Sequence, residues 1–169
     1  ASFLALQKNY EGAESMLKRA IAATETSLGS EHADLLKPLT SLANLHMTAG
    51  RLKDAEPCYK RILEIKHKVF GEDSTEIVTS LLQLGELYMI QSNFAEAEVT
   101  FETAFETAQR VYEDDDSRLA DVMLKYATAL SHVGKDKEGA ELHARAEKIK
   151  DTDLTGIDDD IDEALGSIS

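Results

Sequence analysis

Histidine and cysteine are the side chains of this sequence best suited to chemistry, since imidazole and thiolate act as bases, nucleophiles and metal ligands. The chain has five histidines and one cysteine, Cys58. No His-Glu-x-x-His, paired-cysteine, glycine-rich phosphate-loop or nucleophile-elbow motif gathers them into a reactive set. His46 and His143 fall where the pattern described below requires a bulky core residue, so we expect both to serve packing. These residues predict no enzyme, no cofactor and no metal site.

Carboxylates are far more numerous, but their distribution is typical of a solvated surface. The chain has 32 Asp and Glu against 18 Lys and Arg, which gives a net charge of −14. Most are interleaved with lysines rather than isolated as an acid–base pair. The acidic loop 113–116 lacks the alternating ligands and central glycine of a calcium loop. So acidic a chain is not expected to bind nucleic acid or an anionic membrane surface.

The composition favours an all-α protein of the cytoplasm. Apolar residues reach 43%, enough for a core, while nine glycines and two prolines are too few for a many-stranded sandwich. No apolar run approaches the ~20 residues of a membrane span, and no signal-peptide pattern opens the sequence. A single cysteine excludes an internal disulfide framework, which fits a reducing compartment.

A 42-residue period runs through the chain. Gly50 and Gly134 are two periods apart, and Ser92 holds the position between them. Such a period predicts a stacked repeat protein, in which each unit buries its apolar face against the next. The same Ala-Glu segment starts at Ala13, Ala55 and Ala97, and a more divergent copy at Gly139. The predicted units are 1–30, 31–72, 73–114 and 115–150.

Each unit is predicted to form two helices. Apolar residues recur at three- and four-residue steps before and after Gly50, the spacing of one helix face. Gly71 ends the second helix of its unit, and Asp73 or Ser74 can cap the next. Pro38 lies inside an apparent first helix, which we expect to start late or to kink. Small residues should allow close helix approach, with large residues filling the space between them: Ala43, Gly85 and Ala127 against Tyr59, Phe101 and His143.

These spacings resemble the tetratricopeptide repeat family. In that family a large residue, a leucine, a small residue and an aromatic mark the first helix, as at Leu39, Leu42, Ala43 and His46. The 42-residue unit, with Ala-Glu-Pro-x-Tyr-Lys-Arg at 55–61 and Val-Phe-Gly at 69–71, is similar to the kinesin-light-chain type. Over residues 1–150 the resemblance implies a right-handed superhelical solenoid of about three and a half antiparallel helix pairs. The first pair is truncated, because Ala1 aligns with the middle of a first helix.

The truncation suggests a fragment of a longer array, or an array opened by a missing helix, since Phe3, Leu4 and Leu6 would have no upstream partner. Self-association through such an open end, or through the C-terminal tail, is then a possible consequence.

The resemblance also implies a function: first helices line a concave groove that binds a protein or peptide. Leu82, Met89 and Leu124 could receive apolar side chains there, and Asn44 and Thr128 could bond a backbone. Kinesin-type cargo binding is not expected, because the family's paired asparagines are replaced. Binding of a chaperone's acidic C-terminus in a carboxylate clamp is not expected either, because Glu86 and Asp121 would repel that carboxylate. The groove positions are Lys37, Thr40, Asn44, Met47, Thr79, Leu82, Glu86, Met89, Asp121, Leu124, Thr128 and Ser131.

The tail, 151–169, has seven acidic residues and no Lys or Arg. Its apolar residues nevertheless keep helical spacing, which predicts an amphipathic helix. This helix could cap the last helix pair, dock onto another chain or its own groove, or be disordered. The apolar positions are Leu154, Ile157, Ile161, Leu165 and Ile168.

Taken together, the sequence predicts a non-catalytic protein-interaction scaffold. Two alternatives stay open. One is a regulatory module that senses a peptide by changing its superhelical curvature, and the other is a structural spacer of a larger protein that binds nothing through this surface.

Overall fold

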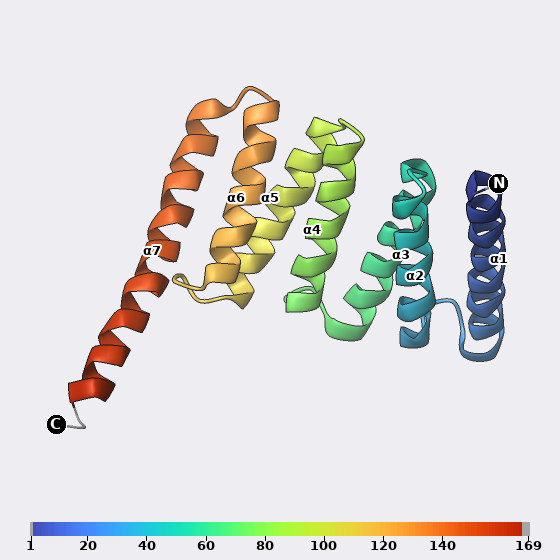
Figure 1. Cartoon of the computed structure of the whole chain (residues 1–169), viewed down its shortest axis with the longest axis horizontal. Helices are drawn as coiled ribbons and strands as arrows, with labels where there is room; N and C mark the ends of the chain where they lie inside the picture. The colour runs from blue at the N-terminus through green and yellow to red at the C-terminus, as the bar shows by residue number, and fades with distance from the viewer. Residues whose placement is uncertain (1, 167–169) are drawn as a thin grey trace.

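The computed structural model describes the backbone of residues 2–166 and the side chains of residues 9–151. Within these limits the chain is all-α, as predicted, and its helices follow one another in a row (Figure 1). Each long helix packs against its neighbours in sequence, and α4 also contacts α6. The helices are α1 (Ser2–Leu28), the 3₁₀ turn η1 (Ala33–Leu35), α2 (Leu36–Thr48), α3 (Leu52–Phe70), α4 (Thr75–Ile90), α5 (Phe94–Val111), α6 (Ser117–His132) and α7 (Asp136–Gly166).

The helix ends follow the turn chemistry of the sequence. Ser74 caps α4 by accepting a hydrogen bond from the Ile77 amide at 3.3 Å. Asp116, from the acidic loop, caps α6 by accepting from the Arg118 amide at 2.8 Å. Gly71 ends α3 with a φ of 81°, a conformation that side chains with a β-carbon disfavour.

Pro38 delays the start of α2, as predicted. In the 42-residue register α2 should begin at residue 33, because α4 begins at Thr75 and α6 at Ser117. Residues 33–35 form η1 instead, and the α-helix begins at Leu36. The proline has no amide hydrogen to donate, which costs little in the first turn of a helix, where the amides have no intrahelical acceptor.

The two ends of the array are long, uninterrupted helices. The truncated first helix expected at the start of the chain is continuous with the second helix of that unit, and both form α1. Lys8 stands where Gly50 ends α2, and its β-carbon disfavours the left-handed conformation of such a helix end. The side chains of Phe3, Leu4 and Leu6 lie outside the described residues.

The C-terminal acidic helix is the second half of α7 rather than a separate element. Figure 1 shows α7 extending past the end of α6. The side chains of the apolar stripe in 151–169 lie outside the described residues, so capping by this segment stays a prediction. Among the described helices, none combines the length and the hydropathy needed to cross a membrane.

The core fills the space between successive helices with two adjoining apolar clusters. One extends from α1 to α6, and the other extends from α4 to α7. Gly85 marks the tightest contact: a β-carbon there would lie 2.6 Å from Cε1 of the buried Phe101 ring. The small-against-large packing predicted for these two residues is therefore confirmed, and it brings α4 against α5.

Candidate partner-binding surface

The predicted groove positions lie on alternate helices, and none of them is buried. α4 and α6 are in direct contact, whereas α3 lies between α2 and α4. The set comprises Lys37, Thr40, Asn44 and Met47 on α2, Thr79, Leu82, Glu86 and Met89 on α4, and Asp121, Leu124, Thr128 and Ser131 on α6.

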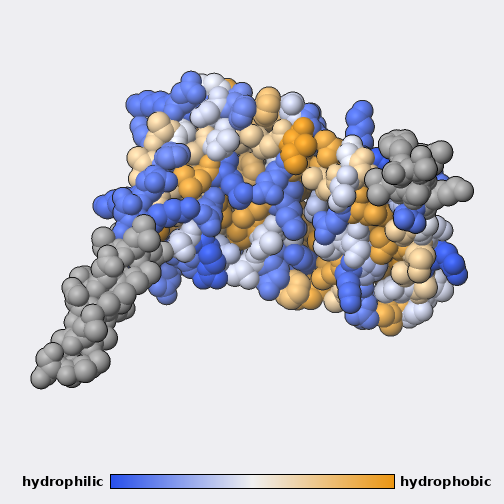
Figure 2. All heavy atoms as spheres, viewed as in Figure 1, coloured by the Kyte–Doolittle hydropathy of each residue, from blue (hydrophilic) through white to orange (hydrophobic). Residues whose placement is uncertain are grey.

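Four apolar members of the set are half-buried. Met47, Leu82 and Met89 pack against the core and keep part of each side chain exposed, and Leu124 does the same on α6. Figure 2 shows hydrophobic residues in patches among hydrophilic ones along the array. Partly exposed Leu and Met side chains can receive an apolar side chain without leaving the core.

Both acidic members of the set are ion-paired. Lys125 of α6 bridges to Glu86 of α4, and Lys150 of α7 lies 2.8 Å from Asp121. The pair with Lys125 joins two first helices across the surface. It also engages one of the few lysines that could have met a partner's carboxylate.

The polar members bond largely within the chain. The Asn44 side-chain oxygen accepts from the Tyr59 hydroxyl at 3.4 Å. Thr79 and Thr128 donate to carbonyls one turn earlier, at 2.9 and 2.8 Å. Their oxygens keep lone pairs, so they remain able to accept from a backbone amide.

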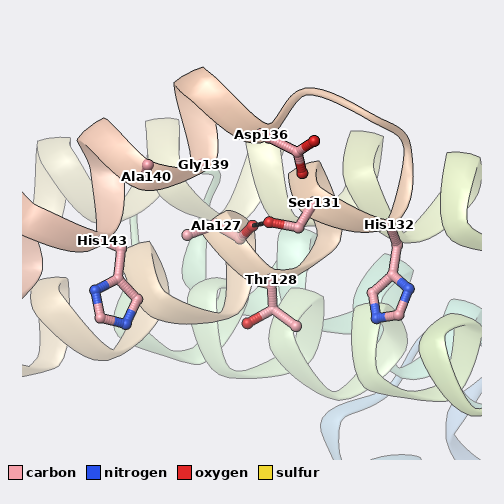
Figure 3. A pocket seen from close by; sticks show the side chains of 8 residues that line it. All are labelled: Ala127, Thr128, Ser131, His132, Asp136, Gly139, Ala140 and His143. Atoms are coloured by element: carbon pink, nitrogen blue, oxygen red, sulfur yellow. Dashed lines mark hydrogen bonds between the residues drawn. The ribbon is translucent and has the colours of Figure 1, made fainter.

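A hollow of about 410 Å³ opens between α6 and α7 (Figure 3). Thr128 and Ser131 line it, together with His132 and His143. Ser131 donates to the Ala127 carbonyl at 3.3 Å, and the His132 ring stacks on Phe94 with centroids 4.3 Å apart. The hollow thus adds two imidazoles to one end of the predicted surface.

The prediction that His143 is a packing residue is wrong, because its side chain is exposed. Phe101 and Tyr59, one and two periods earlier, are buried in the same cluster as residues of the following first helix. In the described part of the chain no helix follows α7, so nothing covers the corresponding face of His143. The repeat pattern identified the position but not its environment.

His46 is buried, as predicted. Its Nδ1 lies 2.5 Å from the Tyr10 hydroxyl, and burial lowers its pKa, so the neutral imidazole is favoured. Burial also raises the pKa of the Cys58 thiol, which donates to the Asp54 carbonyl at 3.6 Å. A neutral thiol is a poor nucleophile. Among the described residues no group of three or more His, Cys, Asp or Glu is arranged to hold a metal ion.

Comparison of the sequence with protein-family models identifies the family of this chain. The family model described as "Tetratricopeptide repeat" matches residues 1–68, 34–91 and 76–152. The chain belongs to the tetratricopeptide repeat family. Domains of this family are typically protein-interaction modules, and no catalytic family is identified in the chain. No similar sequence was found among curated proteins.

The fold of this tetratricopeptide repeat chain is similar to solved structures of kinesin-light-chain-like arrays. BtubC (BKLC) from P. vanneervenii superposes with a TM-score of 0.75 at 20% identity, over 86% of this chain and 58% of BtubC. The nearly identical TPR-like repeats of a candidate kinesin light chain from Podosopora anserina give 0.73 at 19% identity, over 85% and 68%. The chain therefore spans little more than half of BtubC. At such identity the likeness concerns the fold.

Proposed function

We propose that this chain is a non-catalytic interaction module that binds an extended segment or a helix of a partner protein on the surface formed by α2, α4 and α6. The observation that carries the proposal is that all twelve positions are exposed or half-buried on alternate helices of a tetratricopeptide repeat array.

The surface offers apolar side chains that can adapt to a partner, and polar groups that can hydrogen-bond to the partner's backbone. Leu82, Met89 and Leu124 offer apolar area, and Thr128 offers a hydroxyl acceptor beside it. With Glu86 and Asp121 ion-paired, the surface carries less free charge than the chain as a whole. A partner with apolar side chains at helical or alternate spacing fits it better than a highly charged one.

The test is affinity capture from a lysate of the source organism. The parent chain is compared with a Thr79→Arg, Thr128→Glu variant, which changes two exposed residues of the surface and keeps the net charge. A second variant, Leu82→Arg with Leu124→Glu, removes the apolar contact itself. We expect the partners of the parent to be lost from both variants.

The matched control is Met16→Glu with Val99→Arg. These two apolar side chains are 71% and 58% exposed on α1 and α5, away from the surface. The control should keep every partner. Circular dichroism must show the same helical content for all four proteins. Partners retained by the surface variants would contradict the proposal, and the absence of any partner would favour a structural spacer.

A further inference from the structure

The contact between α1 and α2 has a titratable residue at its centre. His46 of α2 is 3% exposed, and its Nδ1 lies 2.5 Å from the Tyr10 hydroxyl of α1. One and two periods later the chain has Tyr88 and Leu130 at this position, and both are buried. Neither of those side chains gains a proton between pH 5 and pH 7. Of the three equivalent contacts, therefore, only the one between α1 and α2 can respond to mild acid.

Few apolar contacts hold α1 in place. Ile21 is the one buried side chain in the described part of α1, and Leu17 packs half-buried against the same core cluster. Burial of apolar surface is the main source of packing free energy, so α1 depends more on its polar contacts than α5 does. The buried side chains of α5 are Ala97, Phe101, Ala104, Thr107 and Ala108.

The charged groups around His46 come from α1 and from the start of α3. Glu14 and Lys18 of α1 form an ion pair at 2.6 Å, and Arg51 lies 2.9 Å from Glu14 and 2.6 Å from Asp54. Two carboxylates and two cations have opposing effects on a charge at the imidazole. Burial is the largest influence on the pKa of His46, and it lowers that pKa.

Protonation makes the closed site unfavourable for His46. A neutral imidazole can accept a hydrogen bond at Nδ1, but an imidazolium has hydrogen on both nitrogens, so Nδ1 can no longer accept the hydrogen of the Tyr10 hydroxyl. The positive charge would also be enclosed, which costs free energy. Movement of α1 away from α2 gives the ring access to water and removes both penalties. Protonation therefore favours a state in which α1 is released.

The link between α1 and η1 permits such a movement. It consists of residues 29–32, and Gly29 has a φ of 97° with open space where a β-carbon would lie. Beyond the glycine, Arg61 of α3 donates to the Ser30 carbonyl at 3.0 Å and holds the link against α3. The link thus combines a hinge residue with a fixed point next to it.

We propose that α1 is an acid-released cover of the array. When His46 gains a proton, α1 turns away about Gly29 and uncovers the face of α2 and α3 that it contacts. The rest of the array stays folded, because α2 and α3 keep their contacts with each other and α3 keeps its contact with α4.

Cys58 reports on the uncovered face. Its side chain is 8% exposed and belongs to the same core cluster as Ile21 of α1. It lies one turn before Arg61, which forms an ion pair with Glu25 of α1, so both residues are on the face of α3 that meets α1. Release of α1 should therefore expose the thiol to a reagent in solution.

The experiment measures how fast 4,4′-dithiodipyridine labels this thiol, the single one in the chain, at pH 7.5 and at pH 5.5. Each rate is divided by the rate for the chain unfolded in urea at the same pH, which removes the effect of pH on the thiol itself. The released state has the ordinary histidine pKa of ~6.5. The normalised rate should therefore rise at least about threefold, and at most about tenfold, from pH 7.5 to pH 5.5.

Three variants assign the response. His46→Leu introduces the residue type of Leu130 at the equivalent position and should abolish the rise. Tyr10→Phe keeps the imidazole but removes its hydrogen bond, so it should speed labelling at pH 7.5 and still show a rise at pH 5.5. His143→Gln changes an exposed histidine of α7 and should retain the parent's full rise.

Denaturant separates release of α1 from unfolding of the whole chain. A local opening exposes little surface, so labelling at pH 5.5 should change little at low urea concentrations, whereas global unfolding would make it rise steeply. A steep rise with urea would overturn the proposal. So would an equal acid response in His46→Leu, or no acid response in the parent chain.

Discussion

Two residues of this chain, Ser92 and His46, differ from the residue types that the repeat has at their positions. Ser92 has a φ of 60°, and it is the one residue other than glycine with positive φ in the described part of the chain. It follows α4 at the position that Gly50 and Gly134 occupy after α2 and α6. His46 takes an aromatic position of the repeat and is buried there as a neutral ring.

Ser92→Gly should stabilise the protein. A left-handed conformation costs an L-residue about 1–2 kcal/mol, which the added freedom of the unfolded chain offsets in part, so we expect a gain of about 0.5–1 kcal/mol. Chemical denaturation measures it. Gly134→Ser, the reciprocal change, should lower stability by a similar amount. A loss on Ser92→Gly would mean that the serine side chain contributes a contact of its own.

His46→Leu should remove a pH-dependent loss of stability. Burial lowers the pKa of His46 in the folded protein, so the unfolded chain binds the proton more readily. The parent chain is therefore fully stabilised above pH ~6.5 and loses stability as the pH falls below that value. Tm measured from pH 8 to pH 5 should fall less in the variant. Tyr10→Phe, which keeps the imidazole, should retain the parent's slope; identical slopes for His46→Leu and the parent would refute this account.

Pairs of helices are held together by the fit of small residues against large ones. The closest approach in α4–α5 depends on the absence of a side chain at Gly85, against a Phe101 ring that is 2% exposed. Local residues, and not packing, determine where the helices begin. Ser74 and Asp116 cap α4 and α6, whereas Pro38 shortens α2. Local signals thus set where helices begin, and packing sets how near they come.

Gly85→Ala should destabilise the protein although alanine is the better helix former. The added β-carbon would lie 2.6 Å from the Phe101 ring, which is too enclosed to move aside. Overpacking costs about 1–3 kcal/mol and outweighs the ~1 kcal/mol gained in helix propensity. Urea unfolding should show a net loss, and Phe101→Leu in the same chain should recover part of it. A net gain would show that α4 and α5 can separate freely.

At the scale of the whole molecule, ion pairs between units recur along the array. Arg51 of the α2–α3 turn lies 2.9 Å from Glu14, and Lys135 of the α6–α7 turn lies 2.8 Å from Glu98. The partners are 37 residues apart in each case. Between them the repeat places Asn93 opposite Glu56, so the middle unit lacks this pair. Bridges of this kind tie neighbouring units without contributing to the core.

Asn93→Lys should complete the series. The asparagine makes no capping hydrogen bond to α5 and would lose only an exposed bond to Gln91, and a lysine there would stand to Glu56 as Lys135 stands to Glu98. Surface ion pairs contribute modestly, so we expect Tm to rise by about 1–2 °C in 20 mM salt and the rise to vanish in 0.5 M NaCl. Lys135→Asn should lower Tm under the same conditions. A rise that persists in high salt would point to a cause other than charge.

The sequence alone determined the repeat, the helix pairs that follow the first unit, and the caps of α4 and α6. These depend on residue spacing and on local hydrogen bonds, as with the late start of α2 at Pro38. It also indicated which helices carry the candidate surface, through the register of the repeat. The structure confirms the all-α array and the core roles of His46, Gly85 and Phe101.

Only the tertiary structure decided what surrounds each position. His143 has the register of Tyr59 but is exposed, because burial depends on the next helix and not on the residue itself. The pairing of Lys125 with Glu86 joins side chains from different units. Spacing along one chain predicts a helix face. Which charges and polar groups meet across units depends on how those faces are stacked in space.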